Sequence, residues 1–204
     1  MHISEGIVSA PVLIGGAALT VIGTAIGLKK LDYDRIMVTA MLVSTFFVAS
    51  LIHVPLGPGS VHLILNGLLG VLLGWACFPA ILTALLLQAV FFQYGGIIVL
   101  GVNCVIMAVP ALASHLLFHS RLFAKTRLAV KGFVAGGLAV MLSSLLMATA
   151  LALSDSGFIA TAKIVVAAHL PVMIIEGLIT MFVLSFINRV QPKILQALPE
   201  KSEK

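Results

Sequence analysis

Residues 61–93 read VHLILNGLLGVLLGWACFPAILTALLLQAVFFQ, a run without a single Asp, Glu, Lys or Arg. A helix of that length would extend about 50 Å, whereas crossing the hydrocarbon core of a membrane takes only about 20 apolar residues. Gly74, Trp75 and Pro79 lie near the middle of the run and offer a break. We therefore predict two shorter membrane spans here, at 61–76 and 79–93.

The rest of the chain has the same apolar character. Of its 204 residues, 61% are hydrophobic and 9% are charged, whereas a soluble domain carries about 25% charged residues. Further membrane helices are predicted at 8–28, 36–52, 97–118, 132–153 and 160–187. The predicted fold class is an all-α polytopic membrane protein with about seven transmembrane helices. One domain covers residues 1–188, and a polar cytoplasmic tail covers 189–204.

The Lys and Arg residues predict the orientation. Most of them lie in the segments 29–35 and 119–131 and in the tail, which the positive-inside rule places in the cytoplasm. The loops 53–60, 93–96 and 154–157 contain neither residue and are predicted to face outside. Seven spans satisfy every loop, whereas fusing 61–93 into one span would not. The N-terminus is therefore predicted outside and the C-terminus in the cytoplasm.

Several functional classes are disfavoured by the sequence. Cys77 and Cys104 lie in apolar runs without CxxC spacing, so buried thiols are expected. The chain has no G-x-x-x-x-G-K-[ST] loop for ATP and no HExxH zinc motif. The Lys and Arg residues behind its net charge of +5 lie mostly in loops and the tail, without the interleaving of basic and aromatic residues that is typical of nucleic-acid binding. A lipid bilayer rather than nucleic acid is therefore the expected partner of this charge.

Polar groups embedded in a membrane are costly and mark candidate functional sites. They are His2, Glu5, His53, His62, Asn66, Gln88, Asn103, His115, His169 and Glu176. The start of the chain, MHISEG, has an acidic residue and no base before Lys29, unlike a secretory signal peptide. We therefore expect 8–28 to be a retained span and Met1 to be kept, because the large His2 disfavours its removal.

Met1 and His2 together form a potential chelate for a metal ion. The N-terminal amine, the His2 amide nitrogen and the His2 imidazole can close a five-membered and a six-membered ring around one ion. A fourth nitrogen would complete a square-planar set, which suits Ni²⁺ or Cu²⁺ and tolerates Co²⁺. Hard ions such as Mg²⁺ and Ca²⁺ prefer oxygen ligands.

Two histidines could supply the fourth nitrogen. His53 and His62 are both predicted at the outer ends of spans, on the same side as the N-terminus. His62 is favoured because it is expected to open the predicted helix 61–76 and to face the bundle. His53 precedes Pro55 and is expected near the lipid headgroups.

His2 and His62 lie within segments that resemble a known family. The segments are MHISEG (1–6), GSVHLILNGLLGVLLG (59–74), YGGIIVLGVNCVIMAVPAL (94–112) and AAHLPVMIIEGLIT (167–180). They are similar to the CbiM/NikM family, the substrate-capturing S-components of energy-coupling-factor transporters for cobalt and nickel. The resemblance covers nearly the whole chain and keeps the order and spacing of the segments.

The resemblance implies a seven-helix S-component with an extra N-terminal helix. It also implies an N4 metal site made by the Met1 amine, the His2 amide and imidazole, and His62. Glu5, Asn66 and Asn103 are candidates for orienting the ligands. His169 and Glu176 match a family segment without a clear role. Many cobalt members carry a Cys/Ser/His/Pro-Thr-Gly stretch where this chain has GPGSVHLILNG, which leaves the choice between cobalt and nickel open.

The family also implies partners: a membrane coupling (T) subunit, a pair of ATPase subunits and a small accessory membrane protein. The metal ion would be cargo, and no bound cofactor is expected. Two alternatives remain open. The first is a membrane-embedded zinc enzyme that uses His62, His53 and Glu5. The second is an S-component for an organic vitamin, although one Trp and two Tyr offer few aromatic side chains to line such a site.

Overall fold

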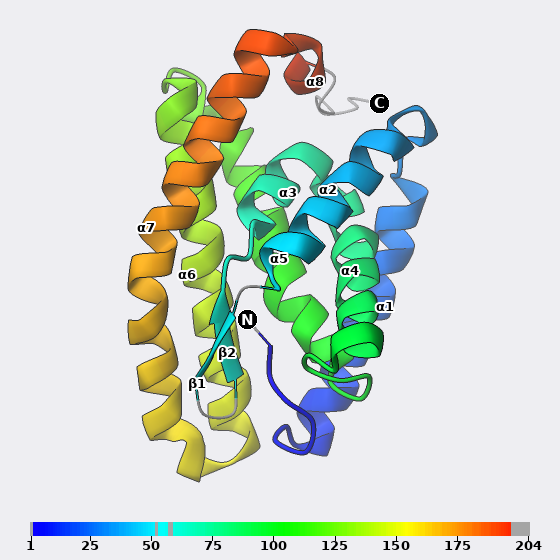
Figure 1. The fold of residues 1–204 in the computed structure, drawn as a ribbon, viewed down its shortest axis with the longest axis vertical. Helices are drawn as coiled ribbons and strands as arrows, with labels where there is room; N and C mark the ends of the chain where they lie inside the picture. The colour runs from blue at the N-terminus through cyan, green and yellow to red at the C-terminus, as the bar shows by residue number, and fades with distance from the viewer. Residues whose placement is uncertain (1, 52, 57–58, 197–204) are drawn as a thin grey trace.

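The computed structural model describes residues 2–51, 53–56 and 59–196, with the backbone alone for 53–56, 59–61 and 196. Its helices form a bundle (Figure 1). Five helical stretches of the described residues are long and apolar enough to cross a membrane. The predicted class of a helical multi-pass membrane protein is therefore confirmed. The helices are α1 (Ala10–Lys29), α2 (Ile36–Ala49), α3 (Asn66–Leu73), α4 (Cys77–Phe92), α5 (Leu100–Phe118), α6 (Leu128–Ser154), α7 (Ile159–Val190) and α8 (Pro192–Gln196).

Small residues let the helices pack closely. The buried residues of α1 are Gly16, Thr20, Gly23 and Gly27, which recur along one face. Thr20 donates a hydrogen bond from Oγ1 to the carbonyl of Gly101 on α5, at 2.7 Å. Because lipid offers little hydrophobic drive between helices, close backbone approach and interhelical hydrogen bonds supply much of the association. This packing places α1 beside α5, next to the segment that carries His2.

A β-hairpin replaces part of the predicted helix 61–76 and the predicted loop 53–60. Strand β1 (His53–Leu56) pairs antiparallel with β2 (Gly59–His62), and His53 lies opposite His62. Val54 and Val61 favour a strand, and Pro55 disfavours a helix interior. The prediction that His62 opens a helix is wrong, because α3 begins only at Asn66.

The hairpin also corrects two predictions about position. His62 is only 4% exposed within the bundle, and the backbone of His53 is paired with it. Both residues therefore lie in strands rather than at helix ends as predicted, and the depth of His53 relative to the headgroups stays a prediction. Pairing satisfies the backbone groups on the inner edge of each strand, and non-helical segments are tolerated at membrane depth where they are buried in protein.

The predicted span 36–52 contains a shorter helix, and the predicted span 61–76 is divided between a strand and a helix. Helix α2 has 14 residues, fewer than the predicted span 36–52, and the chain continues into β1. Strand β2 leads into α3, which has 8 residues. Figure 1 shows α2 and β1 leading away from the end of the molecule that carries α8, and β2 and α3 leading back. The count of seven crossings and the outside location of the N-terminus stay predictions.

The predicted break within 61–93 is confirmed. Gly74 has φ +55°, a backbone conformation that favours glycine, and it starts a 3₁₀ turn over Gly74–Ala76. Helix α4 then begins at Cys77. Pro79 lies in its first turn, where a missing N–H costs little. Figure 1 shows α3 and α4 running in different directions on either side of this turn.

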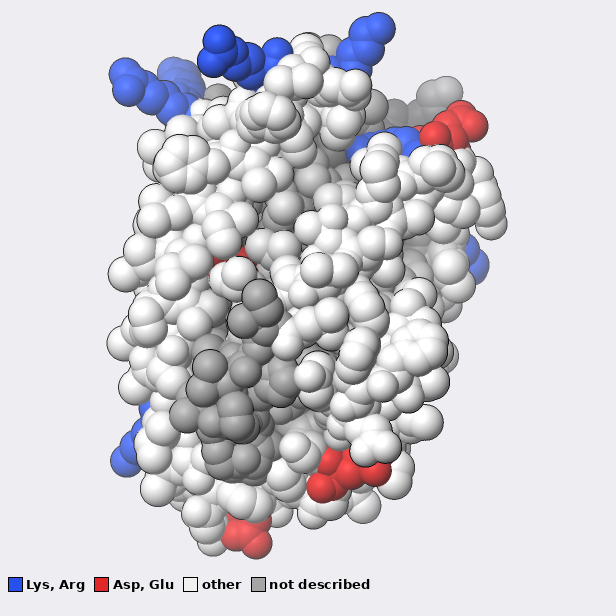
Figure 2. All heavy atoms as spheres, viewed as in Figure 1, with Lys and Arg blue, Asp and Glu red and all other residues white. Residues whose placement is uncertain are grey.

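The basic residues gather at one end of the bundle. Figure 2 shows most Lys and Arg side chains at the end that carries α8, and acidic side chains at both ends. Lys29 ends α1, Arg127 precedes α6 and Arg189 lies in the last turn of α7. The predicted tail 189–204 begins within α7 and includes α8, and residues 197–204 lie outside the described residues.

Candidate metal centre

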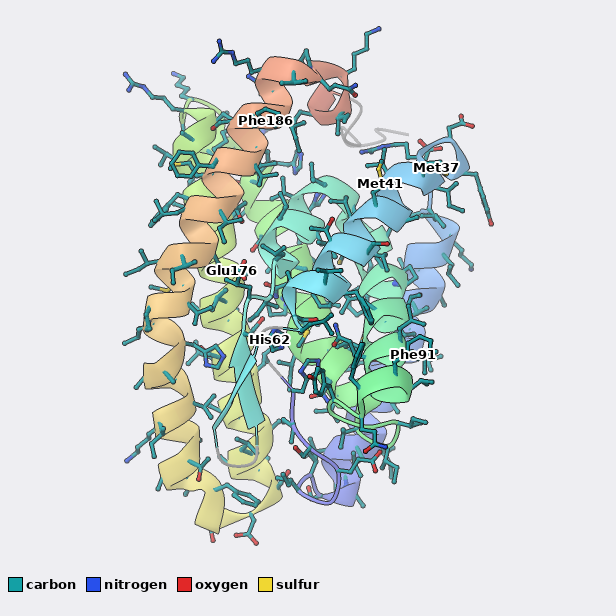
Figure 3. All side chains as sticks on the ribbon, viewed as in Figure 1. Met37, Met41, His62, Phe91, Glu176 and Phe186 are labelled. Carbon is teal, nitrogen blue, oxygen red and sulfur yellow. The ribbon has the colours of Figure 1, made fainter. Side chains whose placement is uncertain are left out.

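The imidazole rings of His2 and His62 meet inside the bundle. The Nε2 atom of His62 lies 3.2 Å from the Nδ1 atom of His2, and the ring centroids are 4.8 Å apart. His2 is 5% exposed and His62 is 4% exposed. Figure 3 shows His62 at the end of the hairpin that leads into α3. Two residues far apart in the sequence thus share one buried position.

A chain of hydrogen bonds determines which nitrogen of His2 carries a proton. The Ser50 hydroxyl donates to the carbonyl of Phe47 at 2.8 Å, so its oxygen accepts from the Nε2 group of Gln88. The Oε1 atom of Gln88 then faces Nε2 of His2 at 2.7 Å. Because an amide oxygen only accepts, Nε2 of neutral His2 must donate. Nδ1 is therefore left with its lone pair.

The hydrogen bond of the His62 ring favours the complementary tautomer. Nδ1 of His62 lies 2.7 Å from the carbonyl oxygen of Leu63. A carbonyl only accepts, so Nδ1 donates and Nε2 keeps its lone pair. The two nitrogens that face each other across 3.2 Å are thus both lone-pair donors. Such an arrangement repels unless a proton or a metal ion lies between them.

The separation of these two nitrogens suits two ligands of one metal ion. Bonds of about 2.0 Å from a metal to imidazole nitrogens at a right angle place the nitrogens about 2.9 Å apart. The observed 3.2 Å is close to that value. Fixing the tautomer of a ligating histidine through its other nitrogen is the usual role of groups around a metal site. Gln88 and Leu63 have that relationship to the two rings.

The N-terminal segment is held against α5 and the turn before it. Asn103 accepts from the Ile3 N–H at 2.9 Å and donates to the Ile3 carbonyl at 3.1 Å. Glu5 accepts from the Ile98 N–H at 2.9 Å, and Gly96 leaves the space that its side chain occupies. The predicted candidates Asn103 and Glu5 thus hold the segment that follows His2 against α5 and the turn before it.

Two other predicted residues occupy different positions. Asn66 donates to the carbonyl of Met107 at 3.0 Å and to the hydroxyl of Ser143 at 2.9 Å, which joins α3 to α5 and α6. His169 donates from Nδ1 to the carbonyl of Val165 at 2.7 Å. Its Nε2 atom is buried without a hydrogen-bond partner in the described part of the chain. In the described part of the chain, these hydrogen bonds of Asn66 and His169 go to groups other than His2 and His62.

Comparison with known proteins identifies the family. Residues 2–194 match the model of the CbiM family, described as the cobalt uptake substrate-specific transmembrane region. The chain belongs to the CbiM family. A candidate metal transport protein of Haemophilus influenzae is 45% identical over 201 residues, which cover 96% of this chain and 97% of that protein.

Two further similarities support the membership. The fused nickel transport protein NikMN of Rhodobacter capsulatus is 38% identical over 115 residues, which cover 53% of this chain and 33% of that protein. A crystal structure of a transition metal transporter is 25% identical, with a TM-score of 0.85 over 96% of this chain and 97% of that one. The predicted resemblance is thus confirmed at the level of family and fold.

The site of this CbiM-family chain contains two groups whose role the sequence does not reveal. Gln88 is recognisable from the sequence only as an embedded polar residue, and Ser50 carries no signal of its own. The one side-chain amide in the largely apolar helix α4 is the only sign of Gln88. Met1 and the side chain of His53 lie outside the described residues. Within the described part, no group of three or more His, Cys, Asp or Glu could hold a metal ion.

Proposed function

We propose that this CbiM-family chain is the substrate-capturing S-component of an energy-coupling-factor transporter that imports Co²⁺ or Ni²⁺. The observation that carries this proposal is the close approach of two buried imidazole nitrogens, His2 Nδ1 and His62 Nε2, which lie 3.2 Å apart. The family description names cobalt, and one relative is named for nickel transport. The relatives and the similar structure are metal transport proteins, which argues against the zinc-enzyme alternative.

The proposed ligands are four nitrogens. In a chain whose first residue is Met1, its amine, the amide nitrogen of His2 and Nδ1 of His2 bind consecutive corners of a square. Nδ1 is the nitrogen that closes the six-membered ring, and it is also the nitrogen left with a lone pair by Gln88. His62 then occupies the fourth corner, next to Nδ1. The short distance between the two rings supports this assignment.

The same ligands suggest how the metal ion is released. Its ligands must be deprotonated to bind, so protonation of the amide and imidazoles favours release. The chain has no P-loop of its own. We therefore propose that energy comes from a T subunit and an ATPase pair, with a small accessory membrane protein as a further partner. The chain matches only 33% of the fused NikMN protein, which supports a larger assembly.

The decisive experiment extends the N-terminus by two residues, because a single added residue would leave the histidine third in the chain, where the amine, two amides and the imidazole can form a new four-nitrogen chelate. Ni²⁺ and Co²⁺ binding to purified protein that begins at Met1 is measured by calorimetry, and again with two Gly residues added before Met1. The matched control carries two Gly residues after Lys204. The proposal expects the N-terminal addition to abolish tight binding and the C-terminal addition to leave it unchanged. Undiminished binding by the N-terminally extended protein would rule out the N4 site.

A further inference from the structure

Glu176 on α7 is a fully buried carboxylate, 0% exposed, whose hydrogen bonds lead towards the metal centre. Its Oε1 atom accepts from the backbone N–H groups of Ile64 and of Leu65, the latter at 2.9 Å, and Oε2 accepts from Leu65 at 3.0 Å. Burying a charge is costly unless it is hydrogen-bonded. Both carboxylate oxygens of Glu176 are hydrogen-bonded to the turn that joins β2 to α3 and that begins directly after His62.

A single peptide bond connects this carboxylate to the His62 ring. The N–H of Ile64 and the carbonyl of Leu63 belong to the same peptide unit. The N–H donates to Glu176, and the carbonyl oxygen accepts from Nδ1–H of His62 at 2.7 Å. Figure 3 shows Glu176 on α7 and His62 on the hairpin that runs beside it. The carboxylate and the imidazole are thus joined through two hydrogen bonds and one resonant amide.

The consequence for the ring follows from polarisation. The C–N bond of a peptide has partial double-bond character, so a negative charge at the N–H increases the negative charge on the carbonyl oxygen. Hydrogen bonds in such a chain strengthen one another. A stronger acceptor at Nδ1–H makes Nε2 a better electron donor, as a carboxylate does when it accepts directly from a metal-bound histidine.

We propose that Glu176 is a positioning residue for the metal centre. It acts through the Leu63–Ile64 peptide to keep His62 protonated at Nδ1 and to raise the donor strength of Nε2. Leu65, with φ +52°, adopts a conformation that is uncommon for a side chain of its size, and Glu176 binds its N–H directly. The inference rests on the proposed metal-binding function and explains why a carboxylate is buried on α7.

The chain offers a closely matched control on the same helix. Thr180 lies one turn beyond Glu176 and is also 0% exposed. Its Oγ1 atom has no hydrogen-bond partner within the described residues. Thr180→Val therefore perturbs a buried polar position of α7 while leaving the connection to His62 intact. Glu176→Gln keeps the size of the side chain but removes its charge and places an NH₂ group where one oxygen accepts.

The test uses the full-length protein with Ni²⁺ as the probe. Affinity is measured by calorimetry, and the visible absorption band of the nickel-saturated protein reports the strength of the ligand field. Glu176→Gln should weaken binding by about 10-fold or more, within the range of 10–100-fold for groups that orient metal ligands. Its band should move to longer wavelength because Nε2 donates less strongly. Thr180→Val should keep the affinity and band of the unmodified protein.

The band distinguishes the proposed role from simple packing. A residue that only stabilises the fold would lower thermal stability but leave the band of the saturated protein in place. A wild-type band for Glu176→Gln overturns the proposal. If that variant does not fold, Glu176→Asp keeps the charge at a greater distance from the peptide. Glu176→Asp should shift the band by less and in the same direction. A wild-type band for Glu176→Asp would also contradict the proposal.

A parallel His62→Ala variant separates this inference from the proposed function. If His62→Ala binds Ni²⁺ with wild-type affinity and band, the metal site itself is wrongly assigned. If His62→Ala loses binding while both Glu176 variants keep the wild-type band, the site stands and only the role of Glu176 is wrong.

Discussion

Nε2 of His62 lies 3.2 Å from Nδ1 of His2, although the two residues are 60 positions apart in the chain. Each ring donates through its other nitrogen to a fixed acceptor, Gln88 or the Leu63 carbonyl. The two nitrogens that remain face each other in a site almost closed to solvent. The bundle therefore holds side by side the two nitrogens that we propose as metal ligands.

Replacing His62 tests this arrangement directly. His62→Ala removes one of the two converging nitrogens, so Ni²⁺ and Co²⁺ binding should weaken by more than about 100-fold, beyond the effect of changing an orienting group. Calorimetry on the purified protein measures the change. His119→Ala is the matched control, because His119 is exposed near the end of α5. Similar affinities for the two variants would show that His62 is not a ligand.

Gln88 and Ser50 should act as one unit on the His2 ring. Gln88→Leu removes the acceptor for Nε2–H of His2 and frees the ring to change tautomer, so metal affinity should fall by about 10–100-fold. Ser50→Ala leaves the acceptor but lets the Gln88 amide turn, so it should cost less. Residues of one hydrogen-bond network are not additive. The double variant should therefore bind no more weakly than Gln88→Leu, and strict additivity would contradict the network.

The sequence predicts the helices well because membrane spans are long and uniformly apolar. The break at Gly74 could be predicted because an unbroken helix over 61–93 would exceed the membrane thickness. The hairpin at 53–62 could not be predicted in the same way. Its strands have only four residues each, too few for a clear alternating pattern, and strand formation depends on the surrounding packing.

The site was predictable only in part, for a similar reason. His2 and His62 were expected together, and the structure brings them together. The Ser50–Gln88 contact joins α2 to α4, and the Asn103–Ile3 contact joins α5 to the N-terminal segment. Such contacts depend on how each helix is rotated against its neighbours. Sequence shows that an embedded amide is costly but not which residue it faces.

Two adjacent glycines on α1 provide a matched test of helix packing. A Cβ on Gly16 would lie 2.6 Å from Cγ2 and 2.8 Å from Cα of Val102, whereas nothing lies within 4 Å of one on Gly15. Gly16→Ala should therefore destabilise the protein by about 1–3 kcal/mol, the usual cost of overpacking. Gly15→Ala should be neutral or stabilise by up to about 1 kcal/mol through helix propensity. Thermal unfolding in detergent measures both, and equal shifts would contradict the α1–α5 contact.

Asn103 should control the position of His2 through the adjacent residue. Its amide makes two hydrogen bonds to the backbone of Ile3, each contributing about 0.5–1.5 kcal/mol. Asn103→Leu removes both, so the N-terminal segment should loosen and metal affinity should fall by about 10-fold, because part of the binding free energy must then order that segment. Faster amide hydrogen exchange at Ile3 should accompany the loss.

The control for this variant is Asn188→Leu, because Asn188 is exposed near the end of α7. It should change neither the exchange at Ile3 nor the affinity. If Asn103→Leu speeds the exchange but keeps wild-type affinity, then His2 finds His62 without the tether. The two imidazoles would in that case be brought together by the metal ion rather than held ready for it.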